Sequence, residues 1–215
     1  MHLIGKVAKW LVILVATVIV VASGWLYFFP PALIRVGAAY SAKMACSNVF
    51  LAHRDAAEVL SVDVQAPGHP LLKNIDLQKI GEDGYSASLY GILAREIAVY
   101  RPGLGCTVVA DGDLEKVRGM RLAAEPAIVA ESDYEWPMGD QVSLAANPQV
   151  TALLADPALT GPGMRAVVVV KNGKIIGETY GKGFTASTPL LGWSMTKTVT
   201  GALVALRVAE GKLRW

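Results

Sequence analysis

The stretch that most constrains this chain is an uncharged apolar run close to the N-terminus. Residues 10–29 read WLVILVATVIVVASGWLYFF and contain no Asp, Glu, Lys or Arg. Twenty residues in an α-helix are about 30 Å long, which matches the hydrocarbon thickness of a bilayer. Trp10 lies at one edge, and Trp25 and Tyr27 lie at the other, where aromatic side chains favour the headgroup region. The run therefore predicts a transmembrane signal anchor over residues 1–30, in contact with membrane lipid.

A cleaved signal peptide is the main alternative to this anchor, and a buried core helix is a third. Cleavage would fall near residues 22–24, where small side chains cluster. The apolar run continues past that point to Phe29, which is typical of an uncleaved anchor rather than of a signal peptide. Pro30 and Pro31 then end the helix, because proline lacks a backbone N–H and its ring clashes with the preceding turn.

Basic residues flank both sides of the run, so the orientation of the anchor is weakly specified. Lys6 and Lys9 precede it, and Arg35 and Lys43 follow it. The free amino terminus adds positive charge on the first side, which favours a cytoplasmic N-terminus under the positive-inside rule. We expect a single pass through the inner (cytoplasmic) membrane, with the remaining chain facing the periplasm or outside. Export after signal cleavage is the alternative.

The formal charge of the chain comes entirely from this N-terminal segment. Two of the 20 basic residues and none of the 18 acidic residues lie in residues 1–30, so residues 31–215 carry 18 of each. Such a neutral region has no basic stripe, which argues against a nucleic-acid partner. The hydrophobic share of 53% also excludes intrinsic disorder, which requires low hydrophobicity and high net charge.

Two cysteines, Cys46 and Cys106, follow the membrane signal. An even number of cysteines in an exported region indicates a disulfide, with two buried free thiols as the alternative. The chain-entropy relation gives such a bridge about 4 kcal/mol of stabilisation. The three histidines, His2, His53 and His69, have no metal-ligand spacing among themselves or with the cysteines, so we expect no metal site.

Residues 31–144 read as an exported region ahead of a second domain, and they suggest no separate activity. Apolar residues spread through 32–60 predict a largely helical segment. Residues 66–84 are richer in Pro, Gly and charge and are interpreted as a connection. Residues 85–110 predict strands around turn-forming glycines, and residues 111–144 are polar and irregular.

Residues 145–215 show clearer signals for individual elements. Asn147 followed by Pro148 predicts the start of a short helix. AVVVV, Asn172-Gly173 and KIIGETY predict a β-hairpin whose first strand is of the buried type. A final helix over about 195–210 ends at Gly211. Its helical spacing predicts a buried stripe formed by Val199, Ala202, Leu203, Leu206 and Ala209.

Ser194 and Lys197 lie at the start of that last helix, within the sequence Ser-Met-Thr-Lys. A spacing of three places both side chains on one helical face, within reach of a shared proton. A serine there can attack a carbonyl if a neutral lysine accepts its proton, and burial or nearby cations favour the neutral amine. The alternative from spacing alone is that Ser194 caps the helix and Lys197 is a surface residue.

The wider context resembles the serine β-lactamase and penicillin-binding-protein superfamily, and most of all its class C-like branch of esterases and 6-aminohexanoate-dimer hydrolases. The resemblance rests on the hairpin, on GWSMTKT over 192–198 and on EGKL over 210–213, and it covers roughly residues 145–215. It implies that Ser194 is the acylated nucleophile and Lys197 its proton acceptor. It also implies that the Ser194 N–H is one of two oxyanion donors, and it implies no metal or organic cofactor.

The resemblance further implies an α+β fold class: a transmembrane helix, then the start of a β-lactamase-like sandwich of helices on an antiparallel sheet. The family carries a Tyr-x-Asn or Ser-x-Asn element and a Lys/His-Thr/Ser-Gly strand after the nucleophile. Neither motif follows Ser194 here. We therefore expect the chain to be the N-terminal fragment of a longer enzyme, incomplete at its C-terminus.

Three functional hypotheses follow from the sequence. The first is a membrane-anchored serine hydrolase that cleaves a small-molecule amide or ester through an acyl-serine intermediate, with the activity belonging to a longer parent protein. The second is a catalytically incompetent anchored fragment. The third is a penicillin-recognising protein or β-lactamase. Substrate and oligomeric state are left open, because the walls of the pocket would come mostly from later residues.

Overall fold

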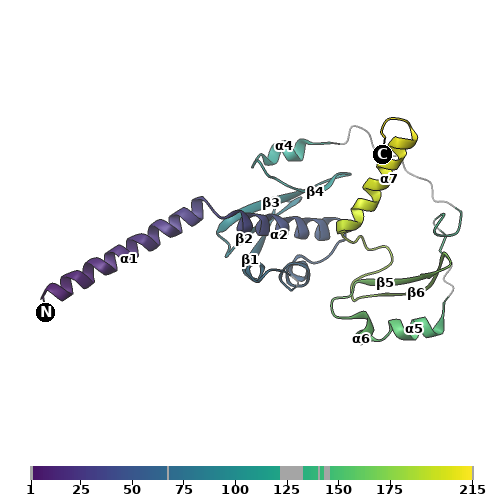
Figure 1. The fold of residues 1–215 in the computed structure, drawn as a ribbon, viewed down its shortest axis with the longest axis horizontal. Helices are drawn as coiled ribbons and strands as arrows, with labels where there is room; N and C mark the ends of the chain where they lie inside the picture. Colours follow the sequence, from purple (N-terminus) through teal and green to yellow (C-terminus); the bar gives the residue numbers. More distant parts are fainter. Residues whose placement is uncertain (1, 67, 122–132, 140, 143–145, 215) are drawn as a thin grey trace.

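The computed structural model describes residues 2–66, 68–121, 133–139, 141–142 and 146–214 (Figure 1). Helices combine with antiparallel strands, as expected for the α+β class. The domain boundary expected between residues 144 and 145 lies outside the described residues. The α-helices are α1 (His2–Phe28), α2 (Ala32–Phe50), α3 (Ala56–Val59), α4 (Leu114–Gly119), α5 (Pro148–Leu154), α6 (Pro157–Thr160) and α7 (Thr196–Ala209). The strands are β1 (Ile75–Ile80), β2 (Gly84–Leu89), β3 (Leu93–Arg101), β4 (Gly105–Val108), β5 (Ala166–Lys171) and β6 (Lys174–Tyr180). A π-helix, η1 (Leu60–Gln65), and two 3-10 helices, η2 (Pro70–Asn74) and η3 (Trp193–Met195), complete the set.

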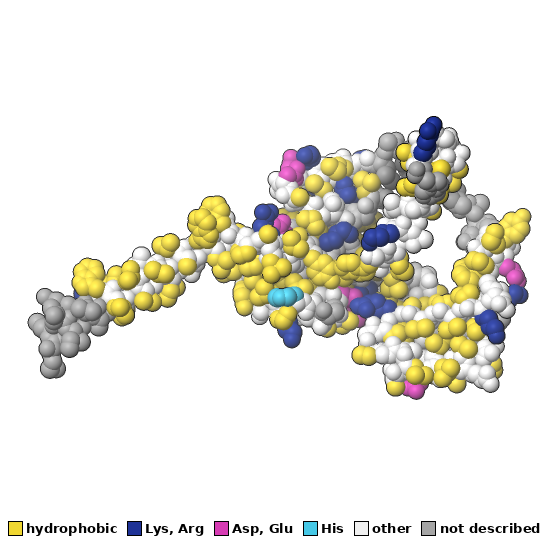
Figure 2. Space-filling model, in the orientation of Figure 1, with side chains coloured by type: hydrophobic (Ala, Val, Ile, Leu, Met, Phe, Trp, Pro, Cys, Tyr) yellow, Lys and Arg dark blue, Asp and Glu magenta, His cyan; other side chains and the backbone are white. Residues whose placement is uncertain are grey.

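Helix α1 is long and projects away from the rest of the molecule (Figure 1). Its segment Lys9–Phe28 has the length and composition to cross a membrane, and none of it is buried against other elements. A signal sequence near the N-terminus passes the same test, so the helix fits both the anchor and the cleaved signal. Hydrophobic side chains cover α1 and continue onto the adjoining end of the globular part (Figure 2).

The exported region is built from a four-stranded antiparallel sheet, β1–β2–β3–β4, with α2 packed across it (Figure 1). Small α2 side chains face this sheet: Ala38, Ala42 and Cys46 are completely buried. They join Ala87 and Ala98 of the sheet in one hydrophobic cluster. Short side chains on both surfaces let the helix backbone approach the strands closely, and this explains why an alanine-rich segment forms the core.

Strand β1 corrects the sequence interpretation, which treated residues 66–84 as a connection. Ile75–Ile80 pairs with β2 from Ile75 opposite Leu89 to Ile80 opposite Gly84. The local signal is weak because Asp76, Gln78 and Lys79 are charged or polar and exposed. Such polar residues are typical of an edge strand, which needs only its neighbour to complete its pairing on one side. The expected helices and strands over 32–60 and 85–110 are present.

The hairpin of β5 and β6 forms a separate two-stranded sheet. Its turn residues, Asn172 (φ 51°) and Gly173 (φ 72°), both have left-handed backbone conformations, as the Asn-Gly signal predicts. The expectation that the first strand is buried is wrong, because Val168 and Val170 are 45% and 46% exposed. Among the described residues, no further strand pairs with this hairpin, and α5 packs against β6.

Helix α5 is fixed to the hairpin by its capping residue and by a close backbone contact. The Asn147 side chain accepts hydrogen bonds from the backbone N–H groups of Gln149 and Val150, at 3.0 and 3.2 Å. The Asn147 N–H donates to the Ile176 carbonyl at 2.9 Å. A Cβ atom at Gly177 would lie 2.7 Å from Val150 Cγ1, so the packing requires glycine there. The predicted start of this helix is confirmed.

Candidate active site

Ser194 and Lys197 are brought together at the start of α7, as their spacing predicts. Ser194 lies in the 3-10 turn η3, and Lys197 lies in the first turn of the α-helix that continues from it. Lys197 Nζ donates a hydrogen bond to Ser194 Oγ at 3.0 Å. This separation lies within the 2.6–3.2 Å range (about) in which a base can take a proton from a nucleophile. The two side chains therefore have the geometry of a serine nucleophile with a lysine partner.

Both side chains of the pair are exposed to solvent in this structure. A lysine acts as a base only when it has lost its proton, and an exposed amine in water stays charged at neutral pH. The structure thus supplies the contact between the two residues without the burial that would favour a neutral amine. The catalytic roles of Ser194 and Lys197 stay predictions that rest on spacing, geometry and resemblance.

The residue before the serine is held against the exported region. Trp193 has a positive φ of 44°, which is unusual for a residue with a bulky side chain. Its ring lies 5.9 Å from the ring of Tyr40 on α2, measured between centroids. Burial, followed by the nearby charge of Asp63, raises the pKa of the Tyr40 hydroxyl, so this ring stays neutral. The contact fixes the approach of the chain to Ser194 from a helix far away in sequence.

A second link between the exported region and the hairpin is ionic. Asp63 lies on η1 and is buried, and its carboxylate forms ion pairs with Arg54, at 2.7 Å, and with Arg165. Arg165 lies just before β5, 102 residues away from Asp63. Both guanidinium groups also lie over the ring of Phe184, at 4.8 Å for Arg54 and 5.8 Å for Arg165. The cluster couples η1 to the segment that leads from the hairpin toward Ser194.

None of these linking residues was singled out from the sequence. Arg54 and Asp63 stand in a segment that reads only as helical, and Phe184 stands in a loop. A buried acid with two arginine partners needs a fold to bring the partners together, and no spacing rule connects positions so far apart. Charged residues within an apolar helical segment were the one available signal.

The two cysteines form the disulfide that the sequence predicts. Cys46 on α2 is bonded to Cys106 on β4, with their Cα atoms 6.0 Å apart. Both belong to the hydrophobic cluster between the helix and the sheet. The bridge therefore fastens α2 to the last strand of the exported region.

Helix α7 differs from its expectation in burial, although its position and ending are as predicted. Val199, Leu203 and Leu206 are about 60% exposed, at 61%, 58% and 59%, and α7 has no buried residue. The predicted burial of this stripe is wrong because, in the described part of the chain, no other element apart from η3 packs extensively on α7. The helix ends in a Schellman motif, in which the N–H groups of Gly211 and Lys212 bond the carbonyls of Val208 and Arg207.

Metal ligands are absent as a cluster from the described ranges: no group of three or more His, Cys, Asp or Glu side chains there could hold a metal ion. The described contacts around Ser194 are hydrogen bonds and aromatic contacts, and they give no further ligand set.

Comparison with known protein families gives one match, and it falls on the segment that carries the serine and lysine. Residues 154–215 match the family described as Beta-lactamase, which is less than a third of the chain. Comparison with curated proteins and with solved structures gave no match. The matched segment begins at the end of α5 and includes the hairpin, Ser194 and Lys197. Residues 154–215 are therefore similar to beta-lactamases, which supports the superfamily of serine β-lactamases and penicillin-binding proteins for this part of the chain.

Proposed function

We propose that this chain is the N-terminal, membrane-anchored part of a serine hydrolase that cleaves an amide or ester bond. The observation that carries the proposal is the 3.0 Å hydrogen bond between Lys197 Nζ and Ser194 Oγ, inside the segment that matches the Beta-lactamase family. Residue types, spacing and distance all agree with an activated serine. The class C-like branch is the part of the superfamily that the sequence around Ser194 resembles most.

In the proposed reaction, Ser194 Oγ attacks the carbonyl carbon of the substrate while its proton passes to neutral Lys197 Nζ. The tetrahedral intermediate then collapses, the bond to the amine or alcohol breaks, and the lysine returns the proton to that leaving group. The acyl group stays on Ser194 until water attacks it. The resemblance assigns the Ser194 N–H to the oxyanion, where a preorganised donor stabilises the developing charge.

The activity is proposed for a longer parent protein, in which further segments cover α7. Two features of the described residues support this. The apolar stripe of Val199, Leu203 and Leu206 is exposed, and exposed apolar surface of this kind on a helix normally packs against another element. Lys197 is also exposed, and the same covering segments would bury it and favour its neutral form.

The anchor is proposed to be α1, with the rest of the chain on the periplasmic or outer side. The unburied apolar segment Lys9–Phe28 supports a membrane location. The Cys46–Cys106 disulfide supports an oxidising compartment for the region that follows.

A catalytically incompetent anchored fragment is the second candidate, and the exposure of Lys197 favours it. The gene sequence past codon 215 separates the two. An in-frame continuation with Tyr-x-Asn and Lys/His-x-Gly motifs supports the hydrolase, and a stop codon supports the fragment. A penicillin-recognising protein differs from both by forming a lasting adduct with penicillin.

Labelling with a fluorophosphonate tests the nucleophile in the protein translated from the complete reading frame. We expect Ser194→Ala to abolish labelling and Ser187→Ala, an exposed serine in the preceding loop, to leave it unchanged. Labelling that persists in Ser194→Ala contradicts the assignment. A parallel incubation with fluorescent penicillin separates a penicillin-recognising protein from a hydrolase of other amides or esters.

A further inference from the structure

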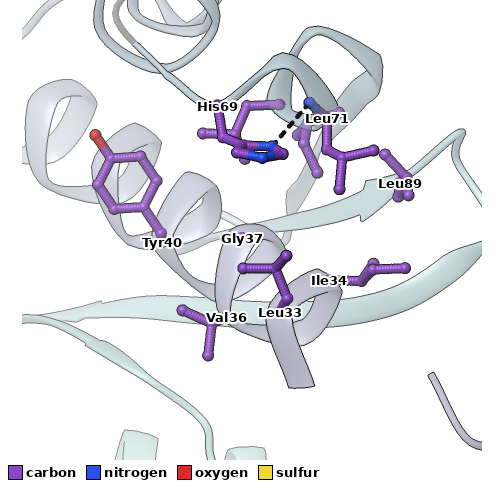
Figure 3. Close-up of a pocket in the computed structure, with 10 residues that line it drawn as sticks. Leu33, Ile34, Val36, Gly37, Tyr40, His69, Leu71 and Leu89 are labelled. Atoms are coloured by element: carbon purple, nitrogen blue, oxygen red, sulfur yellow. Dashed lines mark hydrogen bonds between the residues drawn. The ribbon is translucent and has the colours of Figure 1, made fainter. Parts of the chain in front are cut away.

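An apolar cavity of about 240 Å³ lies beside the first half of α2, well apart in sequence from Ser194 (Figure 3). Side chains from three parts of the exported region line it: α2, the segment of η2, and the sheet edge formed by β1 and β2. The lining includes Leu33, Gly37, Tyr40, His69, Leu72 and Leu89. Eight of its ten lining residues are aliphatic or glycine, so the cavity offers hydrocarbon on nearly every side.

The two polar side chains of the lining have partners elsewhere. The Tyr40 hydroxyl donates to the Asp63 carbonyl at 3.4 Å, so the cavity contacts the ring rather than the hydroxyl. His69 Nδ1 accepts the Leu71 N–H at 3.2 Å, a bond drawn in Figure 3. A ligand that needs hydrogen bonds would lose its contacts with water here without replacing them, whereas a hydrocarbon chain loses none.

The cavity lies close to the end of α1. Four residues separate Phe29 from Leu33, and a chain of that length spans at most about 14 Å. Exposed apolar side chains fill this interval and the first turn of α2: Phe28, Phe29, Leu33 and Val36 are 73%, 63%, 61% and 64% exposed. Figure 2 shows the hydrophobic surface of α1 continuing onto the globular part without a charged break at this junction.

We infer that this cavity binds an acyl chain of a membrane lipid. The inference rests on the proposed anchoring by α1, which would hold the mouth of the cavity at the level of the headgroups, where one chain of a neighbouring lipid can enter. The continuity of the apolar surface from the anchor into the cavity favours lipid over a soluble ligand. The absence of free polar groups on the two polar lining side chains favours the acyl chain over the headgroup as the part bound.

Gly37 provides a direct way to fill the cavity. It lies within α2, and an added Cβ would meet only Leu72 Cδ2, a side-chain end, at 3.2 Å. Gly37→Leu therefore places apolar atoms in the space that the acyl chain would occupy. Gly119→Leu is the matched control, because Gly119 ends a helix where a Cβ meets nothing within 4 Å.

The experiment uses the full chain in phosphatidylcholine vesicles that contain a small share of lipid with a photoreactive acyl chain. Cross-linked peptides are identified by mass spectrometry after illumination. We expect adducts on α1 and on the cavity residues of α2 and η2. Gly37→Leu should lower the cavity adducts at least tenfold (about the loss of two buried methylene groups) and leave those on α1 unchanged. Gly119→Leu should leave both unchanged.

Leu33→Gln is a second variant, at an exposed position where a polar side chain does not disturb packing. It should also lower the cavity adducts, which keeps the test valid if Gly37→Leu does not fold. Adducts on α1 without adducts on the cavity overturn the inference and leave the anchor intact. No adducts on either overturn the anchor and the inference together. Cavity adducts that persist in both variants show contact at the surface only. A dimer that Gly37→Leu dissociates, without lipid adducts, shows that a second copy covers the cavity instead.

Discussion

Removal of the Cys46–Cys106 disulfide should lower the free energy of unfolding of the exported region by about 4 kcal/mol. The two cysteines are 60 residues apart, and closing a loop of that size removes about 14 cal/mol/K from the entropy of the unfolded chain. At 25 °C this corresponds to about 4 kcal/mol. The bridge joins α2 to β4 inside the buried cluster, so native structure is expected to survive its removal in weakened form.

Urea unfolding of the full chain in detergent, followed by circular dichroism, measures this effect. With a denaturant slope of about 2 kcal/mol/M, the midpoint should fall by about 2 M when the disulfide is reduced. Reduction compares molecules that differ only at the two sulfur atoms, so it adds no cavity to the effect. The control is the double variant Cys46→Ala with Cys106→Ala, whose midpoint should not respond to reductant. Equal midpoints for oxidised and reduced protein would refute the assignment of the bridge as a stabilising link.

Three further predictions concern the links around the site and the sheet. Asp63→Ala should lower the free energy of unfolding by about 3–5 kcal/mol, because it leaves the buried Arg54 charge unpaired; urea unfolding checks this, with Glu82→Ala in the exposed Lys79 pair as a control of little effect. Asn147→Ala should cost about 1 kcal/mol through loss of the α5 cap, measured in the same way, and an unchanged midpoint would exclude the cap as a stabilising contact. The Arg118 hydrogen bond holds the pKa of Asp83 below its ordinary value of 3.8, so the pair stabilises the fold above that value and the benefit disappears as pH falls through the lowered pKa. Thermal unfolding should therefore separate Asp83→Asn from the unmodified chain at pH 7 and bring the two together at strongly acidic pH, whereas an equal difference at both pH values would contradict the pairing.

Local signals in the sequence predicted the elements that local chemistry determines. Asn147 and Pro148 start a helix because a capping side chain and a missing N–H suit its first turn. Asn172 and Gly173 form the hairpin turn because both tolerate a positive φ. The contact between Ser194 and Lys197 follows from helical spacing alone. The disulfide followed from the count of cysteines and the membrane signal.

Features that depend on distant partners were not predictable in the same way. Strand β1 carries too few apolar residues to be recognised without β2 beside it. The link from Asp63 to Arg165 joins positions 102 residues apart, and the contact of Trp193 with Tyr40 is similarly remote. The stripe on α7 shows the opposite case. Its periodicity is correct, but periodicity states which face can be buried and does not supply the element that buries it.

The central claim is that Ser194 becomes acylated with Lys197 as its proton acceptor. The most direct measurement is peptide mass mapping of the protein from the complete reading frame, after brief incubation with an activated ester or fluorescent penicillin. The account predicts one acyl adduct, on the peptide that contains Ser194, formed at least about a hundredfold more slowly in Lys197→Ala, the usual scale of acid–base catalysis. An adduct on another residue, or formation at the same rate without Lys197, would contradict it.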